Sequence, residues 1–188
     1  MPKNWHLEDL IMDFYDVIEQ RKSIRMFTAE MPPVDVIDRI LRAARQAPTW
    51  ANMQGCRYTI VTNPEKVALV QEGTGQGWAK SAPMFIIVSI APKNSGTGKH
   101  GIQYYGVDAG ICTTHLLLAI AAEGLGSTFM GIFDEDAIKT AINIPEKERV
   151  IAVLPVGYPA GSSKPTDRKP MEKICFLDEY GNPWQSPG

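Results

Sequence analysis

The run Met84-Phe85-Ile86-Ile87-Val88-Ser89-Ile90, which follows Pro83, is apolar at every position but one. A strand that faced water on one side would alternate apolar and polar side chains, whereas a continuous apolar run predicts a strand covered on both faces. We therefore expect this segment to be the central strand of a sheet, with other elements packed on both of its sides.

Outward from this strand, segments of strand-like composition alternate with segments of helical spacing. Further strands are predicted at 57–62, 127–130 and 150–156. Helices are predicted from about Leu10 to Gln20 or Arg21, from Pro33 to a stop at Pro48, at 65–71, at 106–123, and from the N-cap Asp134 to about Ala141. This interleaving fits one α+β or α/β layer structure without repeats or a linker, so residues 1–188 are expected to form a single domain.

The predicted helix 106–123 is apolar almost all round, which indicates a core helix rather than a surface helix. Gly124-Leu125-Gly126 follows it as a cap. Its most apolar part, 109–122, contains two threonines and His115, and we expect it to be too short and too polar to span a bilayer. His115 is expected to be a satisfied core histidine rather than a ligand. The tail after residue 160 is rich in Pro, Ser, Gly and charge, so it is expected to run over a surface.

The composition excludes several classes of function. Of the 188 residues, 44% are apolar, which is ordinary for a soluble globular protein. A net charge of −2 and an isoelectric point near 5.9 give no basic face for nucleic acid. The amino terminus lacks the apolar core of a secretory signal, and Cys56, Cys112 and Cys175 are widely spaced without a CxxC pair. We therefore expect a cytoplasmic protein with reduced thiols, no metal site, and neither nucleic-acid nor membrane partners.

The segment most informative about function is Arg21-Lys22-Ser23-Ile24-Arg25-Met26-Phe27, directly after the first predicted helix. Its three cations and one hydroxyl lie within five positions, and arginine forks with a short hydroxyl are groups that bind a phosphate monoester. Ile24 and Phe27 alternate with polar positions, so the segment can be half-buried with its cations aimed one way. A solvated basic turn is the alternative interpretation.

Other motifs do not identify a catalytic site. The glycine-rich segment 73–77 follows helix-like residues and lacks the G-x-G-x-x-G spacing of a dinucleotide-binding loop. The sequence contains no P-loop, and its three histidines do not assemble a nucleophilic triad. A protein with so few catalytic side chains can still be an enzyme if a bound cofactor carries the chemistry.

Several motifs, in order along the chain, resemble those of the FMN-dependent nitroreductases, the NAD(P)H:FMN oxidoreductase-like family. Segment 21–27 matches the family's pattern R-[RKH]-S-x-R/K-x-F, and segment 47–54 matches A-P-S-x-x-N-x-Q with Thr49 in place of Ser. The other matches are Ala82-Pro83, Asp108-Ala109-Gly110, Gly124-Leu125-Gly126, Met130-Gly131 and Gly157-Tyr158-Pro159. Together these matches cover nearly the whole chain.

The resemblance implies an α+β nitroreductase-like fold, with a central, mostly antiparallel sheet flanked by helices, in an intertwined homodimer. The flavin would lie in the dimer interface, and the carboxyl-terminal segment 160–188 would extend over the partner subunit, with 172–176 reaching the partner's sheet. The apolar helix 106–123 agrees with a dimer, because a helix that is hydrophobic on all sides needs more cover than one small domain provides.

The resemblance also implies which residues hold the charged parts of the cofactor. Arg21 and Ser23 would bind the FMN phosphate together with Arg168 from the carboxyl-terminal segment, and Lys22 lies beside them in the sequence. Arg25 would reach the pyrimidine edge of the flavin ring. A cation at that edge stabilises the negative charge that builds up on the ring during reduction.

The remaining implied contacts are made to the flavin ring. The backbone at Met130 and Gly131 would approach the flavin N5, where glycine permits close contact, and Gln76 would contact the ring. Four residues would come from the second subunit: Pro48, Thr49, Trp50 and Asn52. No protein side chain is implied to react itself.

Besides Thr49, three positions depart from the family pattern. Thr166 stands where many members have a second phosphate-binding cation, and Met130 stands where several members have Glu, which makes the substrate pocket more apolar. Trp50 is bulkier than the small residue common at its position. It either stacks over a substrate or packs in the interface, and the sequence leaves both open.

The implied activity has two half-reactions at one site, with ping-pong kinetics. NAD(P)H would reduce the flavin, and an electron-poor acceptor such as a nitroaromatic compound or a quinone would then oxidise it. Two alternatives stay open: a flavin enzyme of different redox chemistry on the same fold, such as a dehalogenase, ene reductase or dehydrogenase, and a non-catalytic FMN-binding or regulatory protein. No motif distinguishes NADH from NADPH or names the physiological acceptor.

Overall fold

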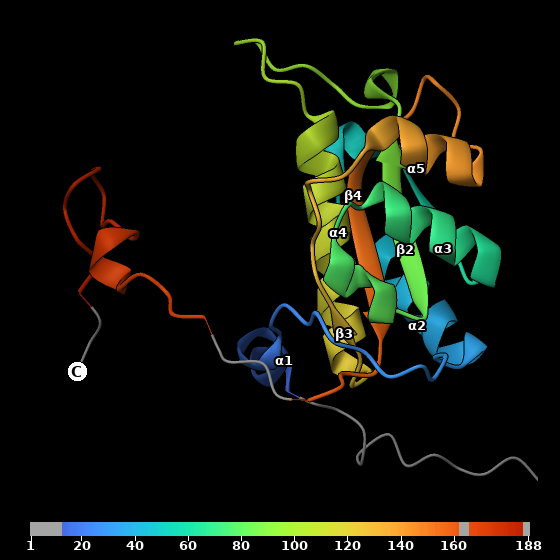
Figure 1. Cartoon of the computed structure of the whole chain (residues 1–188). Helices are drawn as coiled ribbons and strands as arrows, with labels where there is room; N and C mark the ends of the chain where they lie inside the picture. The colour runs from blue at the N-terminus through green and yellow to red at the C-terminus, as the bar shows by residue number, and fades with distance from the viewer. Residues whose placement is uncertain (1–12, 162–165, 186–188) are drawn as a thin grey trace, which may run out of the picture.

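The structure is a computed structural model in which residues 13–161 and 166–185 are described. The elements alternate along the chain much as the hydrophobic patterns predict (Figure 1). The α-helices are α1 (Phe14–Gln20), α2 (Val34–Arg45), α3 (Pro64–Gly73), α4 (Tyr105–Ala122) and α5 (Glu135–Ile142). The strands are β1 (Cys56–Val61), β2 (Met84–Ile90), β3 (Gly126–Ser127) and β4 (Arg149–Gly157). Short 3₁₀ helices are η2 (Trp50–Asn52), η3 (Gly77–Ser81), η4 (Pro92–Asn94) and η5 (Met171–Lys173).

The strands form one antiparallel sheet in the order β1-β2-β4-β3. All seven residues of β2 are buried, as the continuous apolar run predicts for a central strand. Helices interleave with an antiparallel rather than a parallel sheet, so the α+β expectation is confirmed and the α/β alternative is wrong.

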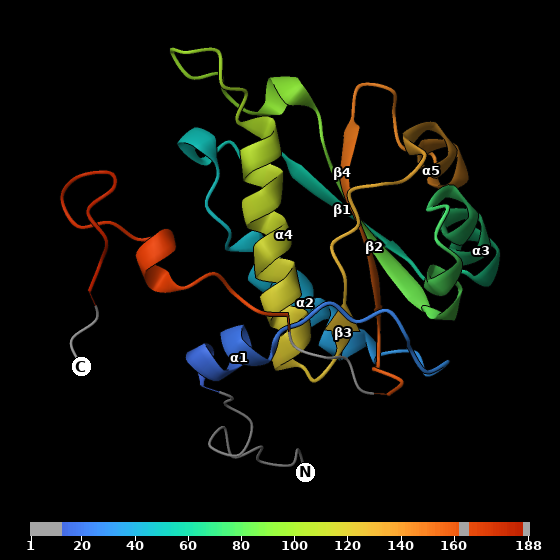
Figure 2. The same cartoon turned by 60° about the vertical axis from the view of Figure 1, so that its left-hand side comes forward.

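Two helical layers cover the sheet, and Figure 2 shows α2 and α4 on the side opposite α3 and α5. Alternate residues of β2 pack against the two helical layers, because successive side chains of a strand point to opposite faces. Phe85 and Ile87 belong to the core beneath α3 and α5, whereas Met84, Ile86 and Val88 belong to the core beneath α2 and α4.

Several predicted boundaries hold and others shift. The Asp134 carboxylate accepts a hydrogen bond from the Ala137 amide at 2.9 Å and caps α5, as predicted. The strand predicted at 127–130 is shorter, because β3 ends at Ser127 and Met130 pairs separately with Val153. The expected start of the first helix at Leu10 lies outside the described residues.

Helix α4 buries one face against the sheet, including Asp108, Cys112, Leu116 and Ile120. Helix α4 begins four residues before the stretch 109–122, and by length and composition alone the whole helix is long and apolar enough to cross a membrane. A core helix of a soluble protein passes the same test. His115 is half-buried, and its Nδ1 lies 3.3 Å from the Ala43 carbonyl oxygen, as expected for a satisfied core histidine.

The described part of the carboxyl-terminal tail, 166–185, leaves the body of the protein as an exposed arm (Figure 1). Its large apolar side chains are about half exposed or more: Met171, Ile174, Leu177, Tyr180 and Trp184. That segment 160–188 reaches a partner subunit stays a prediction, and residues 162–165 and 186–188 of it lie outside the described residues.

Candidate functional site

The cationic segment 21–27 is fixed to the sheet as an extra strand-like stretch. The Ile24 amide donates to the Ser127 carbonyl oxygen at 3.0 Å, and the Thr128 hydroxyl donates to the Ile24 carbonyl oxygen at 2.6 Å. Ile24 and Phe27 are buried, whereas Lys22 and Arg25 are exposed. The alternation in the sequence therefore describes a half-buried segment with exposed cations, and the interpretation as a solvated turn is wrong.

The end of the segment is held equally firmly. The Thr28 amide donates to the Tyr158 carbonyl oxygen and the Ala160 amide donates to the Met26 carbonyl oxygen, both at 2.9 Å. On the other side of the segment, a Cβ on Gly126 would lie 2.7 Å from three Ile24 side-chain atoms. The absence of a side chain at Gly126 lets the segment approach β3 this closely.

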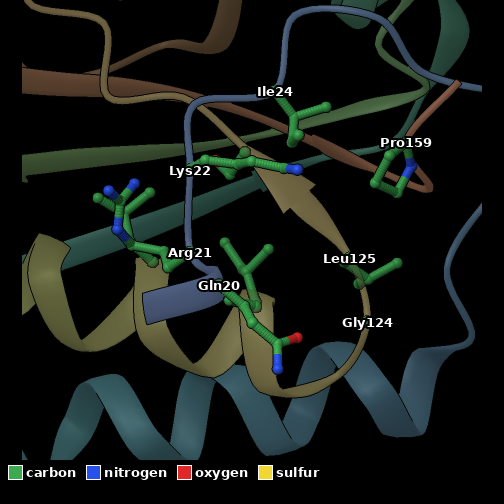
Figure 3. Close-up of a pocket in the computed structure, with 11 residues that line it drawn as sticks. Gln20, Arg21, Lys22, Ile24, Gly124, Leu125 and Pro159 are labelled. Carbon is green, nitrogen blue, oxygen red and sulfur yellow. The ribbon is translucent and has the colours of Figure 1, made fainter. Parts of the chain in front are cut away.

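A cavity of about 300 Å³ lies beside the start of the segment (Figure 3). Arg21 and Lys22 lie on one side of it, the end of α4 forms an apolar wall, and Pro159 closes it; in this view Lys22 extends across it toward Pro159. Ser127 also lines the cavity. Its hydroxyl is buried and has no hydrogen-bond partner among the described residues. The cavity thus offers cations to a ligand, and one unsatisfied hydroxyl is buried in its wall.

Arg25 and Gln76, predicted separately as flavin contacts, are joined by Trp78. The Arg25 guanidinium lies 5.8 Å from the centre of the Trp78 ring, and the Trp78 Nε1 donates to the Gln76 side-chain oxygen at 3.3 Å. Trp78 was not among the predicted contacts, although an aromatic residue next to the glycine-rich segment was a usable signal. A cation and an amide group are therefore held together on one indole.

Arg168 does not line the cavity beside Arg21. Its guanidinium donates to the carbonyl oxygens of Thr166 and Asp167, at 2.9 and 3.4 Å. With Lys22 and the end of α1, Arg168 lines a separate cavity of about 400 Å³. Lys22 lines both cavities, so it connects Arg168 to the cationic segment.

Met130 and Gly131 differ in their availability for a ligand. The Met130 amide and carbonyl are both hydrogen-bonded to Val153, at 3.2 and 3.1 Å, and its side chain is buried in the core beneath α3 and α5. Gly131 is exposed between the exposed side chains of Phe129 and Ile132. Accessible backbone at this point is therefore that of Gly131.

The other predicted group, Pro48 to Asn52, is anchored to the start of α4. The Trp50 amide donates to one Asp108 carboxylate oxygen at 2.8 Å, and the Ser95 hydroxyl donates to the other at 2.6 Å. The Trp50 ring lies 4.3 Å from the Tyr104 ring, centre to centre. Asn52 has a left-handed backbone, with φ of 57°. These contacts give the loop a defined shape at the surface.

Helix α4 separates the two predicted groups. Trp50 contacts Asp108 in the first turn, whereas Ala121 lines the cavity beside Arg21. At 1.5 Å per residue, these two positions on α4 are about 20 Å apart along the helix. One copy of the chain therefore does not bring segment 21–27 and the Pro48–Asn52 loop together.

The described residues do not assemble a metal site. In residues 13–161 and 166–185, no group of three or more His, Cys, Asp or Glu side chains could hold a metal ion. The assembled side chains are cations, hydroxyls, amides and an indole, and these are groups that hold an anionic organic ligand.

The sequence is similar to those of known proteins. The sequence profile of the Nitroreductase family matches residues 18–158. A protein of Methanothermobacter thermautotrophicus, described as an NADH dehydrogenase/NAD(P)H nitroreductase, is 31% identical over 79% of this chain and 78% of its own length. Iodotyrosine deiodinase 1 of Pongo abelii is 25% identical over 88% of this chain and 68% of its own length.

Solved structures share the fold. A nitroreductase family protein from Clostridium novyi NT superposes with a TM-score of 0.76 at 30% identity, covering 92% of this chain and 97% of that one. A protein from Staphylococcus epidermidis described as an NAD(P)H:FMN oxidoreductase gives 0.80 at 20% identity, over 89% and 96% of the two chains. The chain belongs to the nitroreductase family of oxidoreductases.

Proposed function

We propose that the protein is an FMN-dependent oxidoreductase that takes hydride from NAD(P)H and reduces an electron-poor acceptor, such as a nitroaromatic compound or a quinone. The observation that carries the proposal is the cationic segment 21–27, which is fixed by backbone hydrogen bonds beside a cavity with an unsatisfied hydroxyl. Family membership supports the redox chemistry, and the donor set supports the cofactor.

The residues present fit the phosphate group of FMN. Arg21 and Lys22 supply positive charge at the cavity, and Ser23 pairs with Ser127 at its edge. The Ser127 hydroxyl is an orphaned buried polar group, and such groups are costly unless a ligand or water satisfies them. Charge-assisted hydrogen bonds from these side chains would hold a phosphate dianion firmly.

When bound, FMN would accept the hydride and pass it on. The chain's own part is geometric and electrostatic. Arg25, braced against Trp78, would place positive charge near the ring and stabilise the negative charge of the reduced state. Exposed Gly131 would let the ring approach the backbone closely. Arg168 would complete the phosphate site by turning from the carbonyl oxygens of Thr166 and Asp167, with Lys22 lining the same cavity.

A second copy of the chain would complete the site. The Pro48–Asn52 loop lies at the opposite end of α4, so a partner related by a two-fold axis could place its loop against segment 21–27. The uncovered apolar surface of α4 supports such an interface, because the exposed and half-buried faces include Val107, Leu117 and Leu118.

Anaerobic spectroscopy tests the activity. Purified protein should be yellow, should bleach with NADH or NADPH, and should regain its colour with a quinone or nitro compound. Steady-state kinetics should be ping-pong, and intersecting lines would contradict a shared site. Protein that stays yellow with both nucleotides would favour a non-catalytic FMN-binding protein, and protein that cannot be reconstituted with FMN would refute the proposal.

Two arginine variants test the division of roles within the segment. Arg21→Ala should mainly lower FMN retention, because it removes a phosphate ligand. Arg25→Ala should mainly slow flavin reduction, because it removes charge near the ring. If both variants lost only FMN, the assigned roles would be wrong.

A mixing experiment tests the two-copy site separately from the chemistry. Arg21→Ala and Asn52→Gly damage opposite halves of the site, and glycine tolerates the left-handed backbone at position 52. Random reassortment into mixed dimers should restore FMN binding at about a quarter of the sites, since each mixed dimer keeps one intact site. No recovery in confirmed mixed dimers would place both halves of a site in one chain, while the spectroscopic test of activity would still stand.

Reductive dehalogenation is a second candidate. Its support is the similarity to iodotyrosine deiodinase 1 over 88% of this chain. An anaerobic screen of the reduced protein should therefore include halogenated phenols beside nitroaromatic compounds and quinones. Faster reoxidation by the halogenated phenols, with release of halide, would favour this candidate.

A further inference from the structure

Two cysteines that are far apart in the sequence meet in the fold. Cys56 begins β1 and Cys112 lies on the buried face of α4, and the fold places both residues in the lining of one small cavity. The third cysteine, Cys175, lies on the carboxyl-terminal arm. The sequence spacing predicted no cysteine pair, and the packing of α4 on β1 creates one.

The pair lines a cavity of about 110 Å³ at the end of α2. Arg45 and Gln54 also line it and are exposed, so the cavity reaches the protein surface. Its volume corresponds to roughly three or four water molecules, since water occupies about 30 Å³ in the liquid. A small neutral oxidant therefore has room beside Cys112, although Cys112 is itself buried.

The surroundings distinguish the two thiols. The hydrogen bond from Cys56 lowers the pKa of Cys112 below the usual thiol range, against the effect of burial. The same hydrogen bond, together with burial, raises the pKa of Cys56. The Tyr58 hydroxyl has a single proton and donates it to the Ala44 carbonyl oxygen at 3.3 Å, so Cys56 is the main donor to Cys112. Cys112 is the more nucleophilic partner, because the thiolate is the reactive form of cysteine.

We propose that Cys56 and Cys112 form a peroxide-responsive dithiol, at a cavity that Thr49 of the Pro48–Asn52 loop also lines. The Cys112 thiolate attacks one oxygen of hydrogen peroxide, and the O–O bond breaks. Hydroxide leaves, takes up from water a proton equivalent to the one that Cys112 released on ionising, and becomes water, while Cys112 becomes a sulfenic acid. The Cys56 thiol then attacks the sulfenic sulfur and releases a second water, which leaves a disulfide. In sum, two thiols are oxidised and one peroxide is reduced to two waters.

Thiol counting and peptide mapping test the proposal on the whole purified protein. Untreated protein should titrate three thiols after denaturation, and peroxide-treated protein should titrate one. Digestion without reductant should yield a peptide that joins Cys56 to Cys112, and dithiothreitol should restore all three thiols. Non-reducing gel electrophoresis should show no disulfide-linked dimers.

Three serine variants define the roles of the cysteines. Cys175→Ser is the matched control and should form the same disulfide. In Cys56→Ser, oxidation should stop at the sulfenic acid, so Cys112 should carry one added oxygen. In Cys112→Ser, Cys56 and Cys175 should both remain thiols under the same treatment. Far-ultraviolet circular dichroism checks that each variant is folded.

The pH dependence of the oxidation rate distinguishes a reactive pair from two thiols that are merely adjacent. In Cys175→Ser, the oxidation rate should reach its plateau at a lower pH than for N-acetylcysteine under the same conditions. Retention of all three thiols in peroxide, a disulfide that includes Cys175, or equal oxidation of Cys56 and Cys112 in the single variants would each overturn the proposal.

Discussion

The two groups of predicted flavin contacts, at opposite ends of α4, are held by different means. Segment 21–27 is held mainly by backbone hydrogen bonds to the edge of the sheet and by the buried side chains of Ile24 and Phe27. The Pro48–Asn52 loop is held by one buried carboxylate, that of Asp108, and by aromatic stacking on Tyr104. The first region should tolerate loss of any one polar side chain, whereas the second depends on Asp108.

This difference has a functional counterpart. In the proposed dimer, segment 21–27 of one copy would receive the loop of the other copy, and the loop carries the bulky residue Trp50. A fixed phosphate site combined with an adjustable loop would allow the acceptor to vary while the cofactor site is retained. The following variants test the contrast between the two regions.

Asp108→Ala should have the largest effect. It removes a buried acceptor and leaves the Trp50 amide and the Ser95 hydroxyl without their partner, so we expect a loss of about 3 kcal/mol in the free energy of unfolding. Urea denaturation measures this loss. Ser95→Ala is the control, and it should lose about 1 kcal/mol because one hydrogen bond disappears. Equal losses in the two variants would mean that the Trp50 contact adds nothing.

Gly126→Ala should have the next largest effect, and in the other region. The new methyl group would meet the branched, buried side chain of Ile24 at 2.7 Å, and such overpacking costs about 2 kcal/mol. FMN retention should fall with stability, because segment 21–27 would be pushed from β3. The double variant with Ile24→Val should lose less than the sum of the two single losses in urea denaturation. Strict additivity would contradict the proposed contact.

Gly96→Ala should have a smaller effect in the loop region. A Cβ there would lie 2.0 Å from the Trp50 Nε1, so the indole must move. Trp50 is 36% exposed and has room to turn outward, and the loss of its stacking on Tyr104 corresponds to about 1 kcal/mol. Near-ultraviolet circular dichroism should change. In a Trp50→Ala background the same substitution should be nearly neutral, and an unchanged loss there would exclude a clash with the indole.

Glu135→Gln is the reference outside both regions and should have the smallest effect. Burial acts to raise the pKa of Glu135, but hydrogen bonds from Arg149 and from the Val150 amide outweigh burial and lower it. A lowered pKa in the folded state stabilises the protein above the carboxyl's unfolded pKa, and this stabilisation disappears as the pH falls through the folded pKa. We expect a loss of about 0.5 kcal/mol at pH 7, because the ion pair with Arg149 is partly exposed.

The pH dependence provides the check on that last prediction. Between pH 7 and acid pH, the difference in unfolding free energy between the wild-type protein and Glu135→Gln should shrink, as urea denaturation at several pH values would show. FMN retention should be the same in both proteins at pH 7. A difference that grows toward acid pH would mean that the sign is wrong.

Much of the fold was readable from local pattern. The apolar run at β2, the helical spacing of α2 and the capping carboxylate of Asp134 are properties of neighbouring residues, and local propensity with burial on a nearby face decides them. The wrong prediction has a non-local cause. The strand predicted at 127–130 breaks after Ser127, because pairing with β4 is decided by a segment more than twenty residues away.

The candidate site divides in the same manner. The sequence by itself determined that segment 21–27 can be half-buried with its cations aimed one way, since the spacing of Ile24 and Phe27 among polar residues is a local property, but it left a solvated turn open. Only the tertiary structure decided that this segment and the Pro48–Asn52 loop lie at opposite ends of α4, that Trp78 joins Arg25 to Gln76, and that Cys56 meets Cys112. Those relations depend on how distant segments pack on one sheet, and no local pattern of residues encodes such distances.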